Sequence, residues 1–186
     1  MFPKFLIDID FETRSAVDLV ACGACRYAED PSTEILCAKL EIRRADTPGT
    51  IYKRTYLGST WSLFPLSQIG VDPKELLSRE QLLALGRKKD VIWTAHNASF
   101  ERALWTTLGG DPPPPEQWRC TAAQAAAAGL PRGLEKAALA LHLPLQKDAG
   151  GRKLMLKVCK PGYLDTPDSV ARMLAYCAQD VRVEAA

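Results

Sequence analysis

The sequence lacks a long hydrophobic run. No apolar stretch approaches the roughly 18 to 20 residues that a membrane-spanning helix requires. Lys4, Asp8 and Asp10 interrupt the N-terminal segment in which a signal peptide would be apolar. These absences favour an intracellular, cytoplasmic protein that has no membrane partner.

The sequence also lacks a strong excess of charge of either sign. Its 24 Lys and Arg residues face 22 Asp and Glu residues, which leaves a formal net charge of +2. This balance excludes a highly basic nucleic-acid coat and an acidic solvating tail, so any binding of nucleic acid is expected to be local. With 47% hydrophobic and 25% charged residues, the chain has the composition of a folded protein.

Cysteine follows no repeated metal-binding pattern. The six cysteines lie at positions 22, 25, 37, 120, 159 and 177. Cys22 and Cys25 form a Cys-x-x-Cys pair, but no second pair follows to complete a zinc site. The pattern favours reduced and mostly buried thiols over a redox or metal half-site at this pair.

Hydrophobic periodicity predicts an α/β protein with a mixed sheet. Strands are expected over residues 4–9, 34–43, 50–56 and 91–95, with the first three antiparallel. Helices are expected over residues 73–89, 98–108, 121–128 and 134–141, and from Thr166 toward the C-terminus. The length of 186 residues and the absence of a flexible linker predict one domain over residues 1–186.

Acidic side chains cluster at the end of the first predicted strand. Alternate residues of a strand share a face, so Asp10 and Glu12 point the same way, with Asp8 behind them. Carboxylates gathered in this way repel one another unless water or cations neutralise them, and such oxygen ligands suit Mg²⁺ or Mn²⁺. On these residues alone, a solvated acidic strand end is the ordinary alternative.

Two later segments offer partners for these acids. Tyr176 and Asp180 lie four residues apart on the last predicted helix and therefore share a face. Residues 96–101 (HNASFE) follow a buried strand, and polar groups at such strand ends often bind ligands in α/β sheets. The alternatives are a half-buried tyrosine over a surface acid, a helix-capping Asn97 and a packing His96.

These segments, in this order, carry a resemblance. IDFET (9–13), HNASFE (96–101) and YCAQD (176–180) resemble the three motifs of the DEDD, or DnaQ-like, 3′→5′ exonuclease superfamily. The tyrosine four residues before the last acid is typical of its DEDDy branch. The whole chain is similar to the N-terminal proofreading domain of phage-type family A DNA polymerases, with further similarity at residues 22–28, 118–121, 129–134 and 147–155.

The resemblance implies a ribonuclease H-like fold, which has a five-stranded mixed sheet flanked by helices. It also implies phosphodiester hydrolysis by two divalent cations, Mg²⁺ or Mn²⁺. Asp10 would bind both ions, while Glu12 and Asp180 would bind the ion that activates water. Glu101, which stands where the wider superfamily usually has aspartate, would bind the other ion through water. An alternative adds Asp8 to this site.

The resemblance further implies that Tyr176 orients the attacking water and the scissile phosphate. Substrate contacts are expected at four residues, Thr13, Asn97, Phe100 and Lys147. The basic segment 145–160 is a second candidate for phosphate binding, or else a solvated helix face.

The expected activity is removal of nucleoside 5′-monophosphates from the 3′ end of single-stranded DNA. The expected setting is a monomer in the cytoplasm of a bacterial cell or a phage-infected host, with a polymerase domain in cis or in trans. Two alternatives remain open: a catalytically silent nucleic-acid-binding domain of a polymerase, and an exonuclease of the same superfamily that trims RNA or oligonucleotides.

Overall fold

A six-stranded mixed sheet forms the centre of the molecule, a computed structural model that describes residues 3–47, 51–146 and 148–186. The strand order is β4-β3-β2-β1-β5-β6. The strands are β1 (Phe5–Arg14), β2 (Glu34–Arg44), β3 (Ile51–Leu57), β4 (Leu76–Leu77), β5 (Val91–Ala95) and β6 (Trp118–Cys120). Strands β1, β2 and β3 pair antiparallel, whereas β5 pairs parallel with β1. The predicted mixed α/β architecture and its antiparallel first three strands are thus confirmed.

The sheet has six strands, so the expectation of five is wrong, and its two edge strands, β4 and β6, are not among the strand segments predicted from periodicity. Leu76 and Leu77 pair with β3, whereas the predicted helix over residues 73–89 includes them. The helix begins only after Ser78, whose side chain and backbone form a capping box with Gln81. Asp72 instead closes a tight turn by accepting a bond from the Lys74 amide at 2.9 Å.

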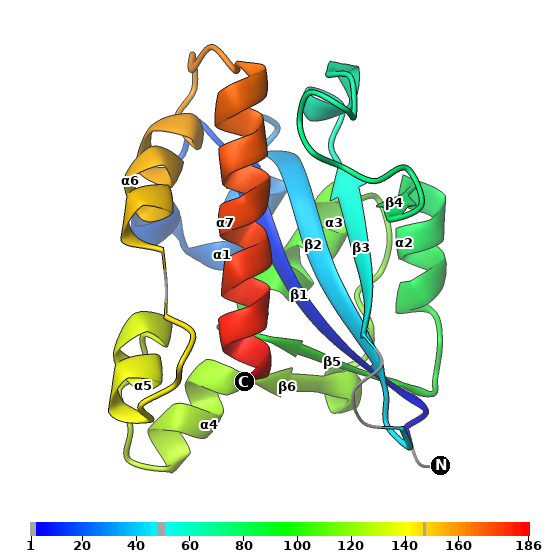
Figure 1. Cartoon of the computed structure of the whole chain (residues 1–186), viewed down its shortest axis with the longest axis vertical. Helices are drawn as coiled ribbons and strands as arrows, with labels where there is room; N and C mark the ends of the chain where they lie inside the picture. Colours follow the sequence, from blue (N-terminus) through cyan, green and yellow to red (C-terminus); the bar gives the residue numbers. More distant parts are fainter. Residues whose placement is uncertain (1–2, 48–50, 147) are drawn as a thin grey trace.

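Helices cover both faces of the sheet. They are α1 (Leu19–Glu29), α2 (Arg79–Gly86), α3 (Ser99–Thr107), α4 (Thr121–Ala127), α5 (Leu134–Ala140), α6 (Ala149–Val158) and α7 (Pro167–Ala185), with short 3₁₀ turns at Trp61–Leu63 and Pro115–Gln117. Helix α7 crosses β1 and β2 on one face, and α1 and α3 lie on the other (Figure 1). None of the described helices has the length and apolar character needed to cross a membrane.

A tryptophan cluster fixes α3 against the sheet. Trp105 of α3 contacts Trp93 of β5 edge to face, with ring centroids 5.2 Å apart, and Trp93 stacks on Trp118 at 5.8 Å. Trp93 and Trp105 are completely buried. Because Glu101 lies four residues before Trp105, it shares the buried face of α3. Burial of Trp105 therefore directs Glu101 toward the sheet.

Helix α7 is held over the other face by an apolar stripe. Its N-terminus has Pro167 at the first helical position and a capping box between Thr166 and Ser169. The stripe repeats every three or four residues, as an amphipathic helix requires, at Val170, Met173, Leu174, Cys177 and Val181. This packing places Tyr176 and Asp180, which flank the stripe, beside the acidic stretch of β1.

Arg14 connects β1 to the segment between α6 and α7. Its guanidinium bonds both oxygens of Asp165 at 2.9 and 3.0 Å, and its Nε donates to the Val158 carbonyl at 2.8 Å. It also pairs with Glu34 at 3.2 Å. The side chains of Arg14 and Asp165 are only 11% and 6% exposed. This buried network holds the C-terminal end of α6 beside the end of β1.

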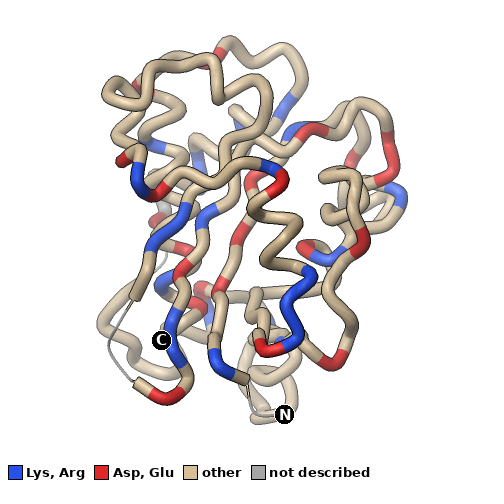
Figure 2. The backbone as a smooth tube through the Cα atoms, turned by 90° about the vertical axis from the view of Figure 1, so that its right-hand side faces the viewer, with Lys and Arg blue, Asp and Glu red and all other residues tan. Residues whose placement is uncertain are grey.

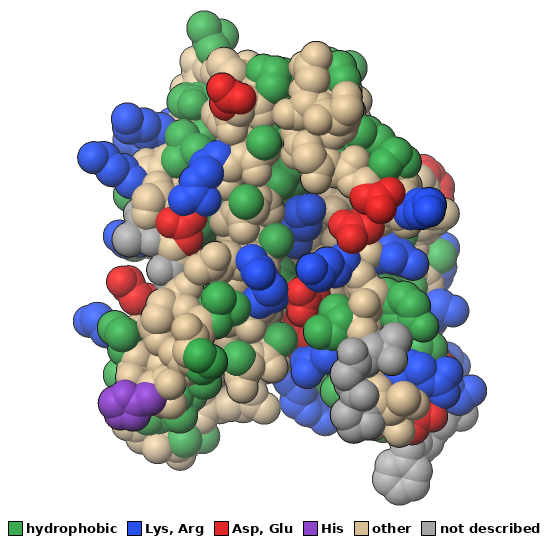
Figure 3. Space-filling model, in the orientation of Figure 1, with side chains coloured by type: hydrophobic (Ala, Val, Ile, Leu, Met, Phe, Trp, Pro, Cys, Tyr) green, Lys and Arg blue, Asp and Glu red, His purple; other side chains and the backbone are tan. Residues whose placement is uncertain are grey.

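Charged side chains of both signs are spread along the chain (Figure 2). Basic side chains gather beside α7 over β2 and β3, and on the outer side of α6 (Figure 3). The groove beside α7 has a volume of about 140 Å³ and is lined by two acids, Glu41 and Glu75, and four bases, Lys39, Lys53, Arg54 and Arg182. On the predicted basic segment, Arg152, Lys153, Lys157 and Lys160 are all exposed.

Replacing Arg14 by methionine is expected to lower the free energy of unfolding by about 3–5 kcal/mol, because it leaves the buried Asp165 carboxylate without its arginine. The matched control is Arg44→Met. Arg44 also pairs with an aspartate at 2.9 Å, but that pair is 48% and 66% exposed, so little change is expected. Denaturant unfolding of both variants measures the difference, and equal losses would contradict this account of Arg14.

Candidate active site

A cavity of about 540 Å³ opens where the end of β1 meets α6 and α7. Four of the expected catalytic residues line it, namely Asp10, Glu12, Tyr176 and Asp180. The remaining walls come from the 15–19 segment before and at the start of α1, from Tyr27, from Phe100 of α3, and from residues 155–161. The structure therefore brings two of the three motif segments together at one cavity and adds Phe100 from the third.

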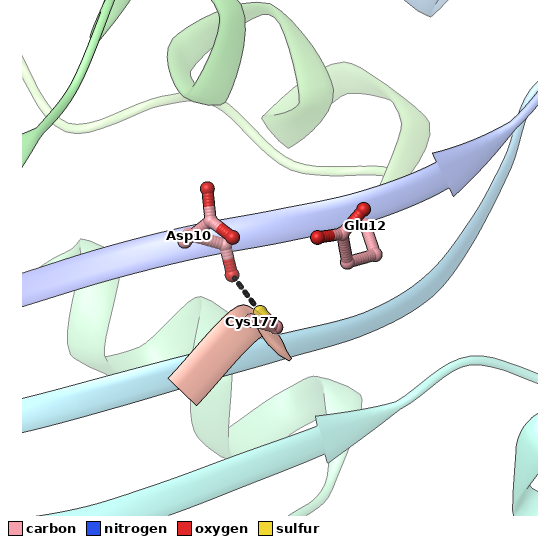
Figure 4. Close-up of side chains that lie close together, drawn as sticks. All are labelled: Asp10, Glu12 and Cys177. Atoms are coloured by element: carbon pink, nitrogen blue, oxygen red, sulfur yellow. Dashed lines mark hydrogen bonds between the residues drawn. The ribbon is translucent and has the colours of Figure 1, made fainter. Parts of the chain in front are cut away.

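Asp10 and Glu12 form a close acidic pair in the cavity. Carboxylate oxygens of both residues and the sulfur of Cys177 lie within 4.8 Å of one another. Figure 4 shows the two acids side by side on β1, with the Cys177 thiol reaching in from α7. That thiol donates to the main-chain oxygen of Asp10 at 3.3 Å. The contact fixes α7 directly against the acidic stretch of β1.

A β-bulge follows the acidic pair. The register between β1 and β2 shifts between Glu12 and Thr13. A bulge breaks the alternation of side chains and redirects the residues beside it. Glu12 pairs with Cys37 and Thr13 with Ile35, so the extra residue is Leu36 of β2. The cavity is lined by four successive residues of β1, Asp10, Phe11, Glu12 and Thr13.

Tyr176 and Asp180 stand on the α7 side of the cavity. They are 2% and 4% exposed, and they share a helix face as their spacing predicts. Burial raises the pKa of the Tyr176 phenol above its ordinary value, and the nearby charges of Asp180 and Glu12 raise it further. Tyr176 is consequently a neutral phenol, able to donate a hydrogen bond.

Glu101 lies behind the cavity rather than on its wall. It is 3% exposed in the first turn of α3. Burial raises the pKa of this carboxyl well above its usual range, and the charge of Asp10 contributes to the same shift. Its Oε2 atom is enclosed and has no hydrogen-bond partner among the described residues. The longer reach of glutamate thus ends in a buried position next to Asp10.

The chemistry of this donor set fits divalent cations. Closely spaced carboxylates suit hard ions such as Mg²⁺ and Mn²⁺. A positive charge at Asp10 would offset the repulsion that raises the pKa of Glu101, and would give the enclosed Glu101 oxygen an electrostatic partner. The sulfur of Cys177 is a softer donor, but in this structure it bonds a main-chain oxygen.

Of the four residues expected to contact the substrate, two line the cavity. Thr13 lines the cavity, where its hydroxyl bonds the Tyr27 hydroxyl at 3.0 Å. Phe100 also lines it, with its ring 5.9 Å from that of Tyr27. Asn97 is exposed, has a positive φ of 69° and is absent from the described cavity walls. Lys147 lies outside the described residues.

The structure also places two further candidates, Asp8 and His96. Asp8 is completely buried and pairs with Arg43 at 2.6 Å, and it does not line the cavity described above. His96 has its Nδ1 atom 2.9 Å from the Thr121 hydroxyl, a contact that fixes its ring beside α4. His96 thus has the contact of a packing histidine, and Asp8, which the alternative adds to the site, lies outside the described cavity walls.

Sequence comparison relates the chain to a phage polymerase. No protein-family model matches the chain. It is 34% identical over 193 residues to a DNA polymerase of Bacillus phage SP02, a match that covers 97% of this chain and 27% of the polymerase.

Structure comparison relates the fold to a ribonuclease. The chain is similar to the crystal structure of Escherichia coli RNase D, described as an exoribonuclease involved in structured RNA processing. The TM-score is 0.50 at 16% identity, over 98% of this chain and 36% of that chain. The chain therefore spans only part of the length of either protein.

Both findings agree with the resemblance that the three motif segments indicate. The likeness to RNase D confirms the expected ribonuclease H-like fold, with the added edge strand β4. The likeness to the SP02 polymerase agrees with the resemblance to phage polymerases that the three motifs indicate.

Several wall residues of the cavity are not identified from the sequence. Tyr27 lies in the stretch 22–28 that shares the resemblance, but its contact with Thr13 depends on the kink that Gly23, with a φ of 77°, introduces into α1. Cys159, at the end of α6, lies 3.9 Å from Glu12. No spacing rule connects either residue to the acids, because each reaches the cavity through tertiary packing.

Replacing Glu101 by glutamine is expected to stabilise the cation-free protein. Because folding raises the pKa of Glu101, stability falls as the pH rises from the ordinary glutamate pKa toward the raised value. At about pH 8, the variant should unfold at a higher temperature than the wild type, by about 2–4 °C for each kcal/mol of relieved burial cost. The difference should shrink toward about pH 4.

Thermal unfolding in EDTA measures this effect. Glu135→Gln is the matched control, because Glu135 also lies in the first turn of a helix but is exposed. A stability gain that is equal at both pH values, or equal in the two variants, would show that burial of the Glu101 charge is not its cause.

Proposed function

We propose that the chain is a divalent-metal-dependent 3′→5′ exonuclease that hydrolyses the terminal phosphodiester of single-stranded DNA and releases nucleoside 5′-monophosphates. The convergence of the three motif segments supports it: Asp10, Glu12, Tyr176 and Asp180 line one cavity, and Glu101 lies behind Asp10. Residues 1–186 form one exonuclease unit in this proposal. The superfamily uses divalent metals, and the donor set here fits them.

The carboxylates hold the cations in this proposal. Asp10, Glu12 and Asp180, which line the cavity, would hold the ion that activates water. Asp10 and Glu101 would hold the second ion, with Glu101 acting through water. When bound, Mg²⁺ or Mn²⁺ supplies a hydroxide nucleophile at neutral pH and neutralises charge that develops on the phosphate.

Tyr176 acts as a hydrogen-bond donor and not as a base. Its raised pKa excludes a significant phenolate population at neutral pH. From α7 its hydroxyl faces the same cavity as the acids, where it orients the attacking water and the scissile phosphate. Proton removal from water is therefore left to the carboxylate and cation environment.

The lining of the cavity suits the end of a nucleic-acid strand. Acidic side chains lie beside apolar ones, among them Leu19, Phe100, Met155, Leu156 and Pro161. Such a wall suits a nucleobase, since stacking on aromatic and apolar side chains is tolerant of sequence. Lys160 at the same wall offers a positive charge to a phosphate.

The choice of DNA rests on the similarity to a DNA polymerase. The same similarity favours a polymerase domain as partner, in cis or in trans, to which the exonuclease would return a corrected end. RNA is the competing substrate, since the catalytic carboxylates and tyrosine do not distinguish the two sugars. A silent binding domain would keep the cavity but lack cation-dependent hydrolysis.

Asp10→Asn is expected to reduce exonuclease activity by about 10³-fold or more, because cation binding contributes several kcal/mol and each 1.4 kcal/mol is tenfold in rate. Asp8→Asn is the matched control. It lies two residues earlier on the same strand face, but pairs with Arg43 outside the described cavity walls, so cation-dependent activity should persist.

The assay follows single-stranded DNA oligonucleotides labelled at the 5′ or the 3′ end, with Mg²⁺, Mn²⁺ or EDTA, and RNA oligonucleotides in parallel. We expect a 5′-labelled ladder and immediate release of the 3′ label, both abolished by EDTA. Degradation that survives EDTA and Asp10→Asn overturns the mechanism. Absence of degradation supports the silent domain, and faster cleavage of RNA supports the trimming enzyme.

Tyr176→Phe is expected to lower kcat by about 10- to 100-fold, because a hydrogen bond to a charged group contributes about 1.5–3 kcal/mol. The dependence of the rate on pH should keep its wild-type form, since the phenol does not titrate in the working range. Steady-state kinetics between pH 6 and about pH 9 measure both effects. Wild-type rates in the variant would remove Tyr176 from the mechanism.

A further inference from the structure

Glu184 is a buried acid next to the candidate cation ligands. It lies four residues after Asp180 in the last turn of α7 and is 8% exposed. Burial raises the pKa of its carboxyl well above the usual range, and the charges of Asp10, Glu101 and Asp180 add to the shift. Glu184 thus faces the same acids that the proposed mechanism uses, although it belongs to none of the three motifs.

The Glu184 carboxyl contacts the turn that leads into α3. Glu184 and His96, the residue directly after β5, line the same cavity of about 290 Å³, and the Glu184 carboxyl accepts a hydrogen bond from the His96 main-chain amide. The ring of His96 is fixed on its other side by Thr121 at 2.9 Å. The next residue, Asn97, has a φ of 69°, and its carbonyl accepts from the Phe100 amide at 2.9 Å. The turn is therefore tied to α7, to α4 and to the first turn of α3.

This turn determines where Glu101 points. Glu101 stands in the first turn of α3, five residues after His96, so a displacement of the His96 amide moves the start of the helix that carries it. Asp180 stands one turn before Glu184 on α7. A bond between Glu184 and His96 consequently connects the element that carries Asp180 with the element that carries Glu101.

Glu184 does not itself belong to the tightest donor group. Within residues 3–47, 51–146 and 148–186, the group whose possible ligand atoms lie within 4.8 Å of one another consists of Asp10, Glu12 and Cys177. Groups that orient metal ligands without touching the ion are typical of metal sites, and their loss usually weakens metal binding or activity by about 10- to 100-fold.

We infer that Glu184 is a positioning residue, whose bond to the His96 amide fixes Glu101 relative to Asp180 in the geometry that binds the cations. The inference rests on the proposed function insofar as Glu101 and Asp180 serve those cations. Its essential feature is the acceptor oxygen and not the negative charge, since the partner is a neutral main-chain amide.

Two substitutions with side chains of nearly equal size distinguish the role of the acceptor oxygen from that of the negative charge. Glu184→Gln keeps an acceptor oxygen, whereas Glu184→Met removes it. Glu184→Met should speed hydrogen exchange of the His96 amide by about tenfold or more, since that is the effect of losing about 1.4 kcal/mol of protection. The exchange of Met173 in the middle of α7 should change little. Glu184→Gln should restore most of the His96 protection.

Cation binding gives a second, independent measurement. Titration with Mn²⁺, followed by the electron paramagnetic resonance of the free ion, should show about 10- to 100-fold weaker binding in Glu184→Met and a substantial rescue in Glu184→Gln. Glu41→Met is the control for loss of a buried glutamate, because Glu41 is 7% exposed but its charged neighbours are Lys53, Arg182, Asp8 and Arg43. The Glu41→Met variant should leave the hydrogen-exchange rate of the His96 amide unchanged.

The outcomes are distinct from those of the exonuclease assay. If the wild type does not degrade DNA, the proposed function fails, while exchange and Mn²⁺ binding still decide the role of Glu184. The inference is overturned if Glu184→Met shows the wild-type exchange rate of the His96 amide and the wild-type affinity for Mn²⁺. It is also overturned if Glu184→Gln and Glu184→Met lose protection and affinity to the same extent. If Glu184→Met does not fold, the wild type decides: a His96 amide that exchanges as fast as an exposed amide contradicts the bond.

Discussion

Enclosure of like-charged carboxyl groups around the end of β1 is the constraint on which the rest of the structure depends. Asp10, Glu12, Glu101, Asp180 and Glu184 come from three elements and meet in a largely buried region. Burial and mutual repulsion raise the pKa values of Glu101 and Glu184 well above their usual range. A fold that keeps such groups together must obtain its stability elsewhere, and the same unfavourable charge is what makes the region receptive to cations.

The stability comes from packing on the two sides of the sheet. Trp93, Trp105 and Trp118 fix α3 from one side, and the apolar stripe of α7 fixes the other. The position of an acid is set by apolar neighbours on its own element, as Trp105 sets the position of Glu101. Polar contacts then refine the placement: Cys177 bonds the Asp10 carbonyl, and Arg14 anchors the end of α6. The arrangement of the acids is thus a consequence of core packing and not a separate feature added to it.

Local sequence patterns predicted the parts of this arrangement that depend on local geometry. Alternation in a strand placed Asp10 and Glu12 together, and helix spacing placed Tyr176 above Asp180. The edge strand β4 was missed because Leu76 and Leu77 continue the leucine pattern of α2, and only their pairing with β3 distinguishes them from helix. Tyr27, Cys159 and Glu184 were missed because long-range packing alone brings them to the acids. Asn97, whose motif indicates a substrate contact, has a positive φ in the turn before α3 and is absent from the described cavity walls.

We infer that these enclosed carboxylates bind divalent cations. Crystals of the wild-type protein can be soaked in Mn²⁺ and their diffraction measured at the manganese absorption edge to detect this binding. Anomalous density should appear in contact with the carboxylates of Asp10 and Glu12, with a second site on the side of Glu101. Anomalous density confined to exposed acids, with none at Asp10, would contradict it.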